Sequence, residues 1–282
     1  MQPDTIFHKF DLTGRVAIVT GGPGLLGKEF CRTLAEAGAT VVVADLNANG
    51  VNLLTTSLIK AGYHAMGVAT DITQPESVNA LVEETLVMYG RLDILVNSAA
   101  LDPKFDPQAL ADMAKKGAIS GAFENYPLDA WQAALDVNLT GMFLCCQAAV
   151  KPMLAQGKKG SIINICSTYG LGAPDQRIYQ RSGKQTSYKP VYYSVTKAGV
   201  LGLTRYLAAY YAGTQIRVNA LTPGGIYNNH DEEFLKAYSS RTIMGRMAEK
   251  DEMNGALLFL ASDASSYMTG SNLVVDGGWT AW

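Results

Sequence analysis

The sequence predicts an α/β fold in which helices cover both faces of a mostly parallel sheet of seven strands. Short β-rich runs alternate with helix-length segments, and this alternation favours parallel βαβ units. The β-rich runs are apolar almost throughout, as is typical of strands that helices bury on both faces. The expected strands are residues 15–20, 40–45, 64–70, 91–97, 160–166, 216–222 and 272–276.

The composition is that of a globular chain with a large core, since 48% of its 282 residues are hydrophobic and 17% are charged. No internal repeat, low-complexity tract or linker divides the chain, so one doubly wound domain over residues 1–282 is expected. Lys and Arg number 23 against 25 Asp and Glu, which gives a formal net charge of −2. Without a basic block, nucleic acids and membrane surfaces are not expected partners.

The amino-terminal residues, MQPDTIFHKFDLTGR, lack the apolar core of a signal peptide. No apolar run reaches the roughly 18 residues that span a bilayer, so we expect a cytoplasmic protein. The four cysteines form no CxxC pair and the three histidines lie far apart, so no metal site is expected. Reduced thiols that fill core space are the expected role of the cysteines.

A glycine-rich segment, TGGPGLLG, follows the first strand and opens a helix. Gly22, Gly24 and Gly27 fit the pattern G-x-G-x-x-G, which in this context marks the dinucleotide-binding turn of a Rossmann domain. Glycine permits the tight turn and lets backbone N–H groups approach a pyrophosphate, whose charge the helix N-terminus favours. Because the chain has 28 glycines, a purely structural turn is the alternative interpretation.

Two aspartates end the second and third strands. Asp45 lies 18 residues after Gly27, where an acidic side chain binds the adenosine ribose hydroxyls and repels a 2′-phosphate. No Lys or Arg adjoins Asp45, so NAD is the expected cofactor and NADP the less favoured one. Asp71 is placed to meet the adenine ring, and a loop cap is its alternative role.

Four polar residues are candidates for chemistry. Tyr193 and Lys197 are four apart and therefore share one helical face. Ser167 lies at the carboxyl end of the fifth strand, where open α/β sheets bind their ligands. Asn138 lies in an otherwise apolar helix, and a buried amide there needs hydrogen-bond partners.

Taken in order, these segments resemble the short-chain dehydrogenase/reductase family, in its single-domain branch. The matching pieces cover nearly the whole chain: TGGPGLLG, Asp45, Asp71, NSAA, VNLTG, NICS, YSVTK, RVNALTPGG and VVDGG. The resemblance implies that Asn138, Ser167, Tyr193 and Lys197 form a catalytic tetrad. In that tetrad Tyr193 takes the proton of a substrate hydroxyl, Ser167 positions the reacting oxygen, and Asn138 anchors a relay water.

Lys197 has two implied roles, because it holds the nicotinamide ribose and its charge acts on Tyr193. A free tyrosine has a pKa of about 10. The Lys197 ammonium and the oxidised nicotinamide are expected to favour the phenolate and so to lower the pKa of Tyr193.

The resemblance also implies a set of cofactor contacts and an oligomer. The glycine spacing departs from the family's usual T-G-x-x-x-G-x-G, which leaves the pyrophosphate geometry open. Asn228 stands where a threonine often meets the nicotinamide carboxamide, and an amide can also donate and accept. A homotetramer or homodimer is expected. The expected cofactor contacts are Gly21, Gly22, Gly24, Leu25, Leu26, Gly27, Asp45, Leu46, Asp71, Ile72, Asn97, Ser98, Ala99, Tyr193, Lys197, Pro223, Gly224, Ile226 and Asn228.

Three segments are expected to rim the substrate pocket: insertions at residues 101–126 and 173–190, and a lid at residues 227–247. The insertions follow strand ends, where long loops are disproportionately functional, and the lid follows TPGG. Their polar side chains favour a hydrophilic substrate over a fatty-acyl or steroid one, although solvation of exposed loops is the alternative. The expected substrate contacts are Asp102, Ser167, Thr168, Tyr169, Arg177 and Tyr193.

We therefore expect an NAD-dependent oxidoreductase that interconverts a secondary alcohol and a ketone on a sugar, polyol or sugar acid, with phosphorylated and nucleotide-linked forms included. LDPKFDP, STYGLGAPDQRIY and VVDGGWTAW are similar to bacterial members found beside surface-glycan and flagellin-modification pathways. Two alternatives stay open. The glycine spacing favours an NAD-retaining sugar epimerase or dehydratase, which the missing C-terminal substrate domain opposes. A non-catalytic dinucleotide-sensing protein is the other, and the complete tetrad opposes it.

Overall fold

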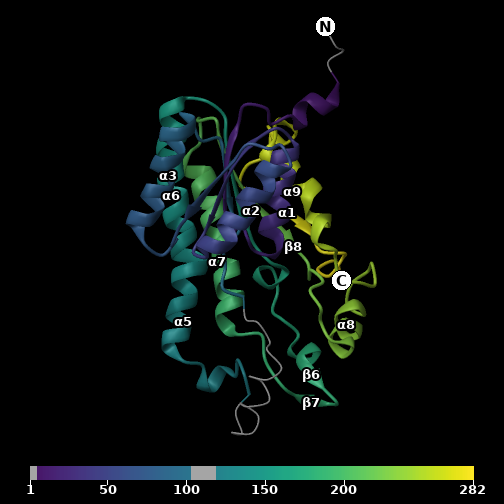
Figure 1. The fold of residues 1–282 in the computed structure, drawn as a ribbon. Coiled ribbons are helices and arrows are strands. Elements are labelled where there is room, and N and C mark those ends of the chain that lie inside the picture. The colour runs from purple at the N-terminus through teal and green to yellow at the C-terminus, as the bar shows by residue number, and fades with distance from the viewer. Residues whose placement is uncertain (1–4, 103–118) are drawn as a thin grey trace.

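The computed structural model describes residues 5–102 and 119–282 and shows a parallel sheet between two layers of helices (Figure 1). The strand order is β3-β2-β1-β4-β5-β8-β9, and every neighbouring pair is parallel. The chain reverses its direction across the sheet between β1 and β4, which makes this the topological switch point. The strands are β1 (Val16–Thr20), β2 (Thr40–Asp45), β3 (Ala65–Ala69), β4 (Ile94–Asn97), β5 (Gly160–Ile165), β8 (Ile216–Pro223) and β9 (Asn272–Val275).

All seven expected strands are present, and the predicted fold class is confirmed. A separate hydrophobic core forms on each face of the sheet. Val16 and Ile18 of β1 face one core, while Ala17 and Val19 face the other, because successive side chains of a strand point to opposite faces. This two-sided burial explains why the strand sequences are apolar without alternation.

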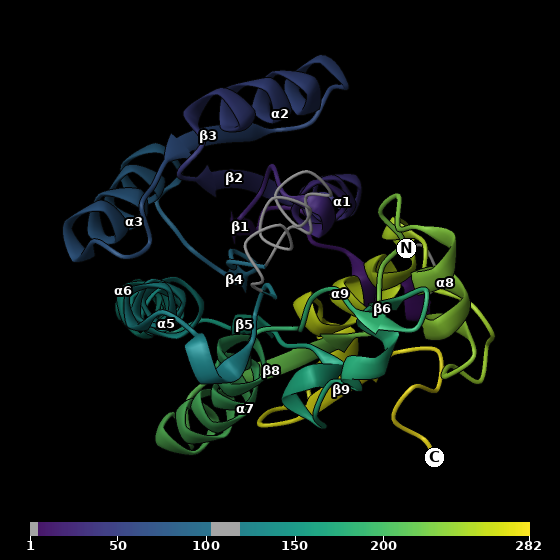
Figure 2. The same ribbon diagram turned by 90° about the horizontal axis from the view of Figure 1, so that it is seen from below.

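Three helices cover each face of the sheet (Figure 2). One layer consists of α3 (Pro75–Tyr89), α6 (Met142–Gln156) and α7 (Val191–Tyr210). The other consists of α1 (Leu25–Glu36), α2 (Ala48–Lys60) and α9 (Asn254–Ala261). Short helical turns complete the described chain: η1 (Ile6–Phe10), η2 (Phe123–Asn125), η3 (Asp136–Gly141), η4 (Thr168–Gly170), η5 (Gln176–Tyr179), η6 (Lys250–Met253) and η7 (Asp263–Ser265).

Beyond the carboxyl edge of the sheet lie α5 (Leu128–Leu135), α8 (Glu232–Ser239) and a small hairpin, in the lower part of Figure 1. The hairpin pairs β6 (Gln180–Arg181) with β7 (Lys184–Gln185) and was not expected from the sequence. Its turn residues, Ser182 and Gly183, have φ of 49° and 74°. Positive φ at both central positions is the geometry that two-residue hairpins favour.

The helical segment Leu128–Gln156, formed by α5, η3 and α6, is long and apolar enough by composition to cross a membrane. Half of its most apolar window is buried inside the fold. Met142, Cys145 and Cys146 of this segment belong to the core between α6 and the sheet. Its apolar composition is therefore that of a core helix.

Candidate active site

The carboxyl ends of the parallel strands bring five loops to one edge of the sheet, the edge that faces the lower half of Figure 1. The glycine turn follows β1, Asp45 ends β2, and Ser98 follows β4. Ser167 follows β5, and Gly224 follows β8. Open α/β sheets bind their ligands at this edge and at the switch point that β1 and β4 form here.

The glycine turn is tight enough to require its glycines. Gly21 has a φ of 69°, and the backbone N–H of Gly24 donates to its carbonyl at 2.9 Å. A Cβ on Gly27 would lie 2.1 Å from the carbonyl oxygen of Gly21, and one on Gly22 would lie 2.6 Å from Val43. Gly24 is the N-cap of α1, so the helix N-terminus opens directly onto the turn. This cradle fits a dinucleotide pyrophosphate.

The neighbouring apolar residues differ in exposure. Leu25 and Leu26 begin α1, and Leu25 is partly exposed beside the turn. Leu46, directly after β2, is largely exposed. Ile72 is buried, and its side chain packs against Gly141.

The two strand-ending aspartates cap their own loops. The Asp45 carboxylate accepts from the N–H of Asn47 at 2.8 Å. The Asp71 carboxylate accepts from both the N–H and the hydroxyl of Thr73, at 2.9 and 2.7 Å. Asp71 therefore has the loop-cap role that was its alternative interpretation, while both carboxylates remain partly exposed at the carboxyl edge.

Asn97 is turned away from the site that was expected for it. Its amide donates to Cys146 Sγ at 3.2 Å and to Asn164 Oδ1 at 2.9 Å, inside the core beneath α6. Ser98 and Ala99 stay at the edge, since their N–H groups donate to the Thr20 hydroxyl at 3.2 and 3.3 Å. The Asn97 side chain thus joins β4 to β5 and α6, while the backbone of Ser98 and Ala99 stays at the carboxyl edge.

The structure brings Ser167, Tyr193 and Lys197 together. Lys197 is buried in α7, donates to the carbonyl of Ile165 at 2.8 Å, and lies 5.8 Å from the centroid of the Tyr193 ring. The Ser167 side chain lies next to the Tyr193 phenol and acts to lower its pKa. A Cβ on Gly170 would lie 2.6 Å from the Lys197 backbone, so this glycine lets α7 approach the loop after β5.

Asn138 lies in η3, a π-helical turn between α5 and α6. Its carboxamide pairs with the backbone of Leu101, accepting from the N–H at 2.6 Å and donating to the carbonyl at 3.0 Å. A longer contact reaches the Thr196 hydroxyl at 3.4 Å. The side chain therefore fixes the loop after β4, which the sequence did not predict, and a role in a water relay stays a prediction.

Burial controls the pKa values of the two central groups. Burial of the Tyr193 phenol, with the negative charge of Asp102 as second cause, raises its pKa well above the ordinary value, and the Ser167 hydrogen bond opposes this. Burial lowers the pKa of the Lys197 ammonium. The protein alone therefore does not show the lowered Tyr193 pKa that the sequence led us to expect.

Lys189 is a site residue that the sequence analysis missed. Its ammonium lies 3.9 Å from the centroid of the Tyr193 ring, closer than Lys197, and it forms an ion pair with Asp102. The Lys189 side chain is 9% exposed, whereas that of Asp102 is 58% exposed. A signal was present, because Lys189 lies four residues before Tyr193 in the second insertion.

The other expected substrate contacts divide into two groups. Thr168 and Tyr169 are buried in η4 beside Ser167, and Tyr169 meets the Tyr193 ring edge-on at 6.4 Å. Arg177 is turned outward, with its side chain 78% exposed and paired to Asp175 of the same loop at 2.8 Å. The structure does not bring Arg177 to the tetrad. Of the first insertion, residues 103–118 lie outside the described residues.

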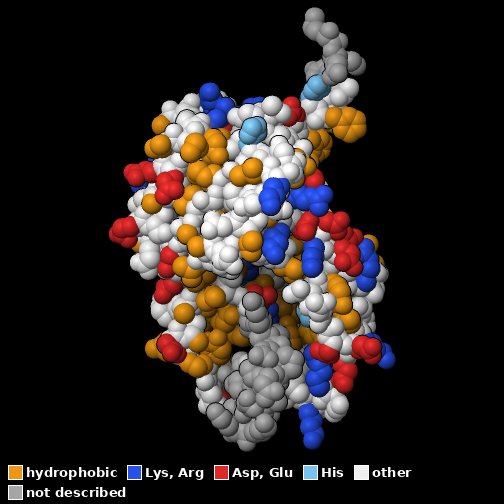
Figure 3. Space-filling view, in the orientation of Figure 1, with side chains coloured by type: hydrophobic (Ala, Val, Ile, Leu, Met, Phe, Trp, Pro, Cys, Tyr) orange, Lys and Arg blue, Asp and Glu red, His pale blue; other side chains and the backbone are white. Residues whose placement is uncertain are grey.

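The second insertion and the lid pack on each other through a small aromatic cluster, which consists of Ile178, Tyr179, Phe234, Tyr238 and Met247. Arg181 of the insertion pairs with Asp231 of the lid at 2.6 Å, and Asp175 pairs with Arg241. Acidic and basic side chains alternate over the lower right of Figure 3, where the hairpin and α8 lie.

The carboxy-terminal segment packs against this cluster within the same chain. Trp279 stacks on Tyr238 at 4.3 Å and meets Tyr169 edge-on at 6.3 Å. Trp282 is 77% exposed, and its indole N–H donates to the carbonyl of Arg241 at 3.1 Å.

The ends of the lid are pinned to each other after β8. The N–H of Tyr227 donates to the carbonyl of Ala248, and the N–H of Ala248 donates to Gly225. Pro223 ends β8, Gly224 donates to Val275, and Ile226 bridges to Ala248. Asn228 follows and is exposed, and its N–H donates to the imidazole of His230.

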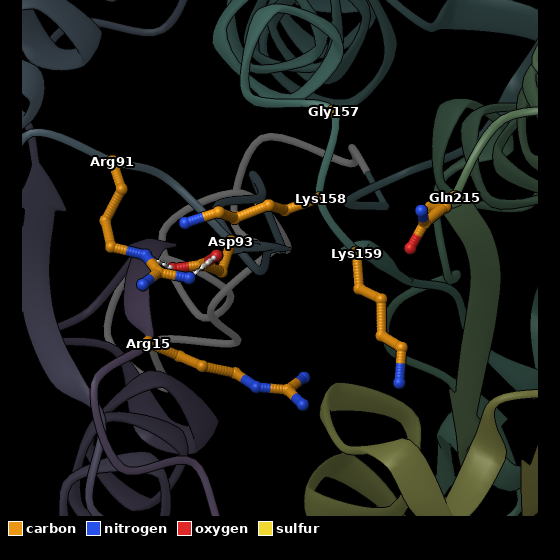
Figure 4. A pocket seen from close by; sticks show the side chains of 7 residues that line it. All are labelled: Arg15, Arg91, Asp93, Gly157, Lys158, Lys159 and Gln215. Carbon is orange, nitrogen blue, oxygen red and sulfur yellow. Dashed lines mark hydrogen bonds and ion pairs between the residues drawn. The ribbon is translucent and has the colours of Figure 1, made fainter.

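A separate hollow of about 320 Å³ lies at the opposite, amino-terminal edge of the sheet (Figure 4). Arg15, Asp93 and Lys159 lie directly before β1, β4 and β5 there. Arg91 pairs with Asp93 at 2.7 Å across the hollow. None of the expected site residues lines it. Within residues 5–102 and 119–282, no group of three His, Cys, Asp or Glu side chains could hold a metal ion.

Known proteins are similar to this chain over nearly its whole length. A family model described as "Enoyl-(Acyl carrier protein) reductase" matches residues 25–280. The chain is 36% identical to cis-4-hydroxycyclohexanecarboxylate dehydrogenase of Sinomonas cyclohexanicum, covering 95% of this chain and 97% of that protein. It is 34% identical to D-threitol dehydrogenase of Mycolicibacterium smegmatis, covering 99% and 98%.

Among solved structures, a gluconate 5-dehydrogenase from Burkholderia cenocepacia in complex with NADP and tartrate superposes with a TM-score of 0.84. It is 31% identical, and the match covers 99% of this chain and all of that one. The matched length, the fold and the edge-of-sheet site together lead to one assignment. This chain belongs to the short-chain dehydrogenase/reductase family and is an NAD(P)-dependent oxidoreductase that acts on CH–OH groups.

Proposed function

We propose that this protein interconverts a secondary alcohol and a ketone on a polar substrate, with NAD as the preferred cofactor. The observation that carries the proposal is the meeting of Ser167, Tyr193 and Lys197 at the carboxyl edge of the sheet. Only β4 separates β5, which Ser167 follows, from β1, which the glycine turn follows. Single polar residues at this edge have many roles. A tyrosine, a serine and a buried lysine gathered at one edge can form an acid–base site.

The proposed chemistry divides simply between cofactor and protein. When bound, the nicotinamide ring carries the hydride. In the oxidation, the Tyr193 phenolic oxygen accepts the proton of the substrate hydroxyl, while the Ser167 hydroxyl hydrogen-bonds the same oxygen. The Lys197 ammonium, held by Ile165, favours the phenolate and binds the nicotinamide ribose.

The preference for NAD is proposed from Asp45. Its partly exposed carboxylate at the end of β2 is placed to accept from ribose hydroxyls and to repel a 2′-phosphate. Structural neighbours with bound NADP make the opposite preference a necessary arm of the test.

The proposed substrate is a sugar, polyol or sugar acid. Polar residues at the rim of the site support it, as do the relatives named for threitol and gluconate. We further propose that the second insertion and the lid at residues 227–247 border the substrate. We also propose that the protein is a single-domain, cytoplasmic enzyme that forms an oligomer. The similarity to glycan-pathway proteins stays a prediction.

The proposal is tested by following NAD reduction over a panel of free, phosphorylated and nucleotide-linked sugars, polyols and aldonic acids, with NADP in parallel. Tyr193→Phe is the matched control, and its turnover should fall at least about 100-fold, the range of general acid–base catalysis, while NADH still binds. Equal turnover in the Phe variant would refute the proposed base.

Two other outcomes would replace the proposal. Cofactor that stays bound through purification, with no net reduction, would support the epimerase or dehydratase alternative that the glycine spacing suggests. Tight NADH binding with silence over the whole panel would support a sensing role.

A further inference from the structure

The ion pair beside Tyr193 has a function that the tetrad does not explain. Lys189 is 9% exposed, and its ammonium lies against the face of the Tyr193 ring, 3.9 Å from the centroid. Among the described residues, the only hydrogen-bond partner of that ammonium is Asp102. A buried ammonium needs a counter-ion, and the described part of the chain provides a single one.

We propose that Lys189 binds a carboxylate of the substrate, so that the preferred substrates are hydroxy acids, and that Asp102 occupies this position only until the substrate arrives. The proposal rests on the proposed function, since it concerns the same site. The Tyr193 hydroxyl touches the reacting oxygen in the proposed reaction. The face of the Tyr193 ring contacts the Lys189 ammonium. One small molecule can therefore meet both groups when its carboxylate lies a few bonds from the carbinol carbon.

The backbone of Lys189 is held by hydrogen bonds that do not involve the ion pair. The Gln176 carboxamide accepts from the N–H of Lys189 at 2.9 Å and donates to its carbonyl at 3.0 Å. Gln185 in turn donates to the carbonyl of Gln176 at 2.9 Å, and Pro190 is the N-cap of α7. The loop is therefore held without the charge of Lys189, so the ammonium can exchange its partner while the backbone stays in place.

Asp102 can be displaced more easily than Lys189. Its side chain is 58% exposed, so water can solvate the carboxylate when it turns outward. A substrate carboxylate that takes its place keeps the buried ammonium paired throughout the exchange. A negative charge close to Tyr193 raises the pKa of that phenol, and the exchange keeps one such charge beside the ammonium.

The geometry favours a carboxylate over a phosphate. Phosphate groups in proteins are bound by several donors, with arginine forks and clustered backbone N–H groups preferred. Arg177 is exposed to solvent and pairs with Asp175, and Arg181 pairs with Asp231. Neither of these two guanidinium groups is therefore available to bind a phosphate together with Lys189. A single ammonium suits one carboxylate.

The experiment compares substrates that differ at one terminus: D-gluconate with D-sorbitol, and L-threonate with L-threitol. For each pair, kcat/KM is measured for the wild-type protein, Lys189→Met, Lys189→Arg and the matched control Lys184→Met. Lys184 lies in the same insertion but is exposed. The Met variant should lower the acid-to-polyol ratio about 10- to 100-fold, the range for a lost hydrogen bond to a charged group. The Arg variant should retain most of the ratio, and the control all of it.

A binding measurement separates this inference from the proposed function. Tartrate is titrated into the protein–NADH complex, with the nicotinamide fluorescence as readout. Binding that weakens about 10- to 100-fold in Lys189→Met and tightens in Asp102→Asn would support the carboxylate site even if no panel member turns over.

Three results would overturn the inference. The first is an equal loss for acids and polyols in Lys189→Met, because it would show that Lys189 acts on Tyr193 and not on the substrate. The second is tartrate binding that does not depend on Lys189. The third is a sugar phosphate whose preference over the acids depends on Lys189.

Discussion

Replacement of Gly27 by alanine should disable the glycine turn while the fold survives. The new Cβ would lie 2.1 Å from the carbonyl oxygen of Gly21 and 2.7 Å from that of Gly22. Real contacts of this kind are essentially never below 3.0 Å. The start of α1 must therefore move by about 1 Å away from the turn, and a displacement of that size costs about 100-fold where groups must align.

The dissociation constant of NADH should accordingly rise about 100-fold, measured by fluorescence titration. The overpacking itself costs about 1–3 kcal/mol, which a domain of ordinary stability withstands, so the far-UV circular dichroism should be retained. Gly255→Ala is the matched control, because Gly255 lies on the exposed side of α9 and its Cβ would meet nothing within 4 Å.

The control should leave NADH affinity unchanged and raise the free energy of unfolding by about 0.5–1 kcal/mol. If Gly27→Ala binds NADH within about threefold of wild type, the turn does not hold the pyrophosphate through its present geometry, and the steric reasoning is wrong.

Three further changes have defined outcomes. Asp45→Ser should raise the kcat/KM ratio of NADP to NAD by about tenfold, as expected for removing a carboxylate near a phosphate in water, and an unchanged ratio would show that Asp45 does not face the ribose. Asp102→Asn removes a negative charge that raises the pKa of Tyr193, so the phenolate should form at lower pH. In a plot of kcat/KM for the oxidation against pH, the rising limb should therefore move to lower pH. A move to higher pH would contradict this reasoning. Trp279→Ala removes ring contacts with Tyr238 and Tyr169 and should lower the free energy of unfolding in urea by about 1–3 kcal/mol, whereas unchanged unfolding would mean that the carboxy-terminal segment is not held in solution.

The sheet and the meeting of Ser167, Tyr193 and Lys197 were predictable because their signals are local or follow from topology. Each strand is an apolar run, and Tyr193 and Lys197 needed only a helical repeat to share a face. Ser167 joined them because the ends of parallel strands meet at one edge. These residues lie far apart in sequence, but the fold class determines their meeting.

What the sequence did not predict depends on contacts between loops. Lys189 reaches Tyr193 because Gln176, thirteen residues earlier, clamps its backbone. The Asn138 carboxamide pairs with the backbone of Leu101, and its expected role in a water relay stays a prediction. Arg177 was predicted to contact the substrate because it is a cation in a polar insertion. The path of the loop directs its side chain to Asp175 and to solvent, and the sequence does not show that path. No periodicity encodes such pairings.

The shared packing of the second insertion and the lid has a kinetic consequence. Because Tyr179 and Phe234 pack in one cluster, with ion pairs at its margin, neither segment can open without the other. Cooperative units of this kind exchange their amide hydrogens together. Release of product would then require one concerted opening of two chain segments, and amides in both should lose protection at a common rate.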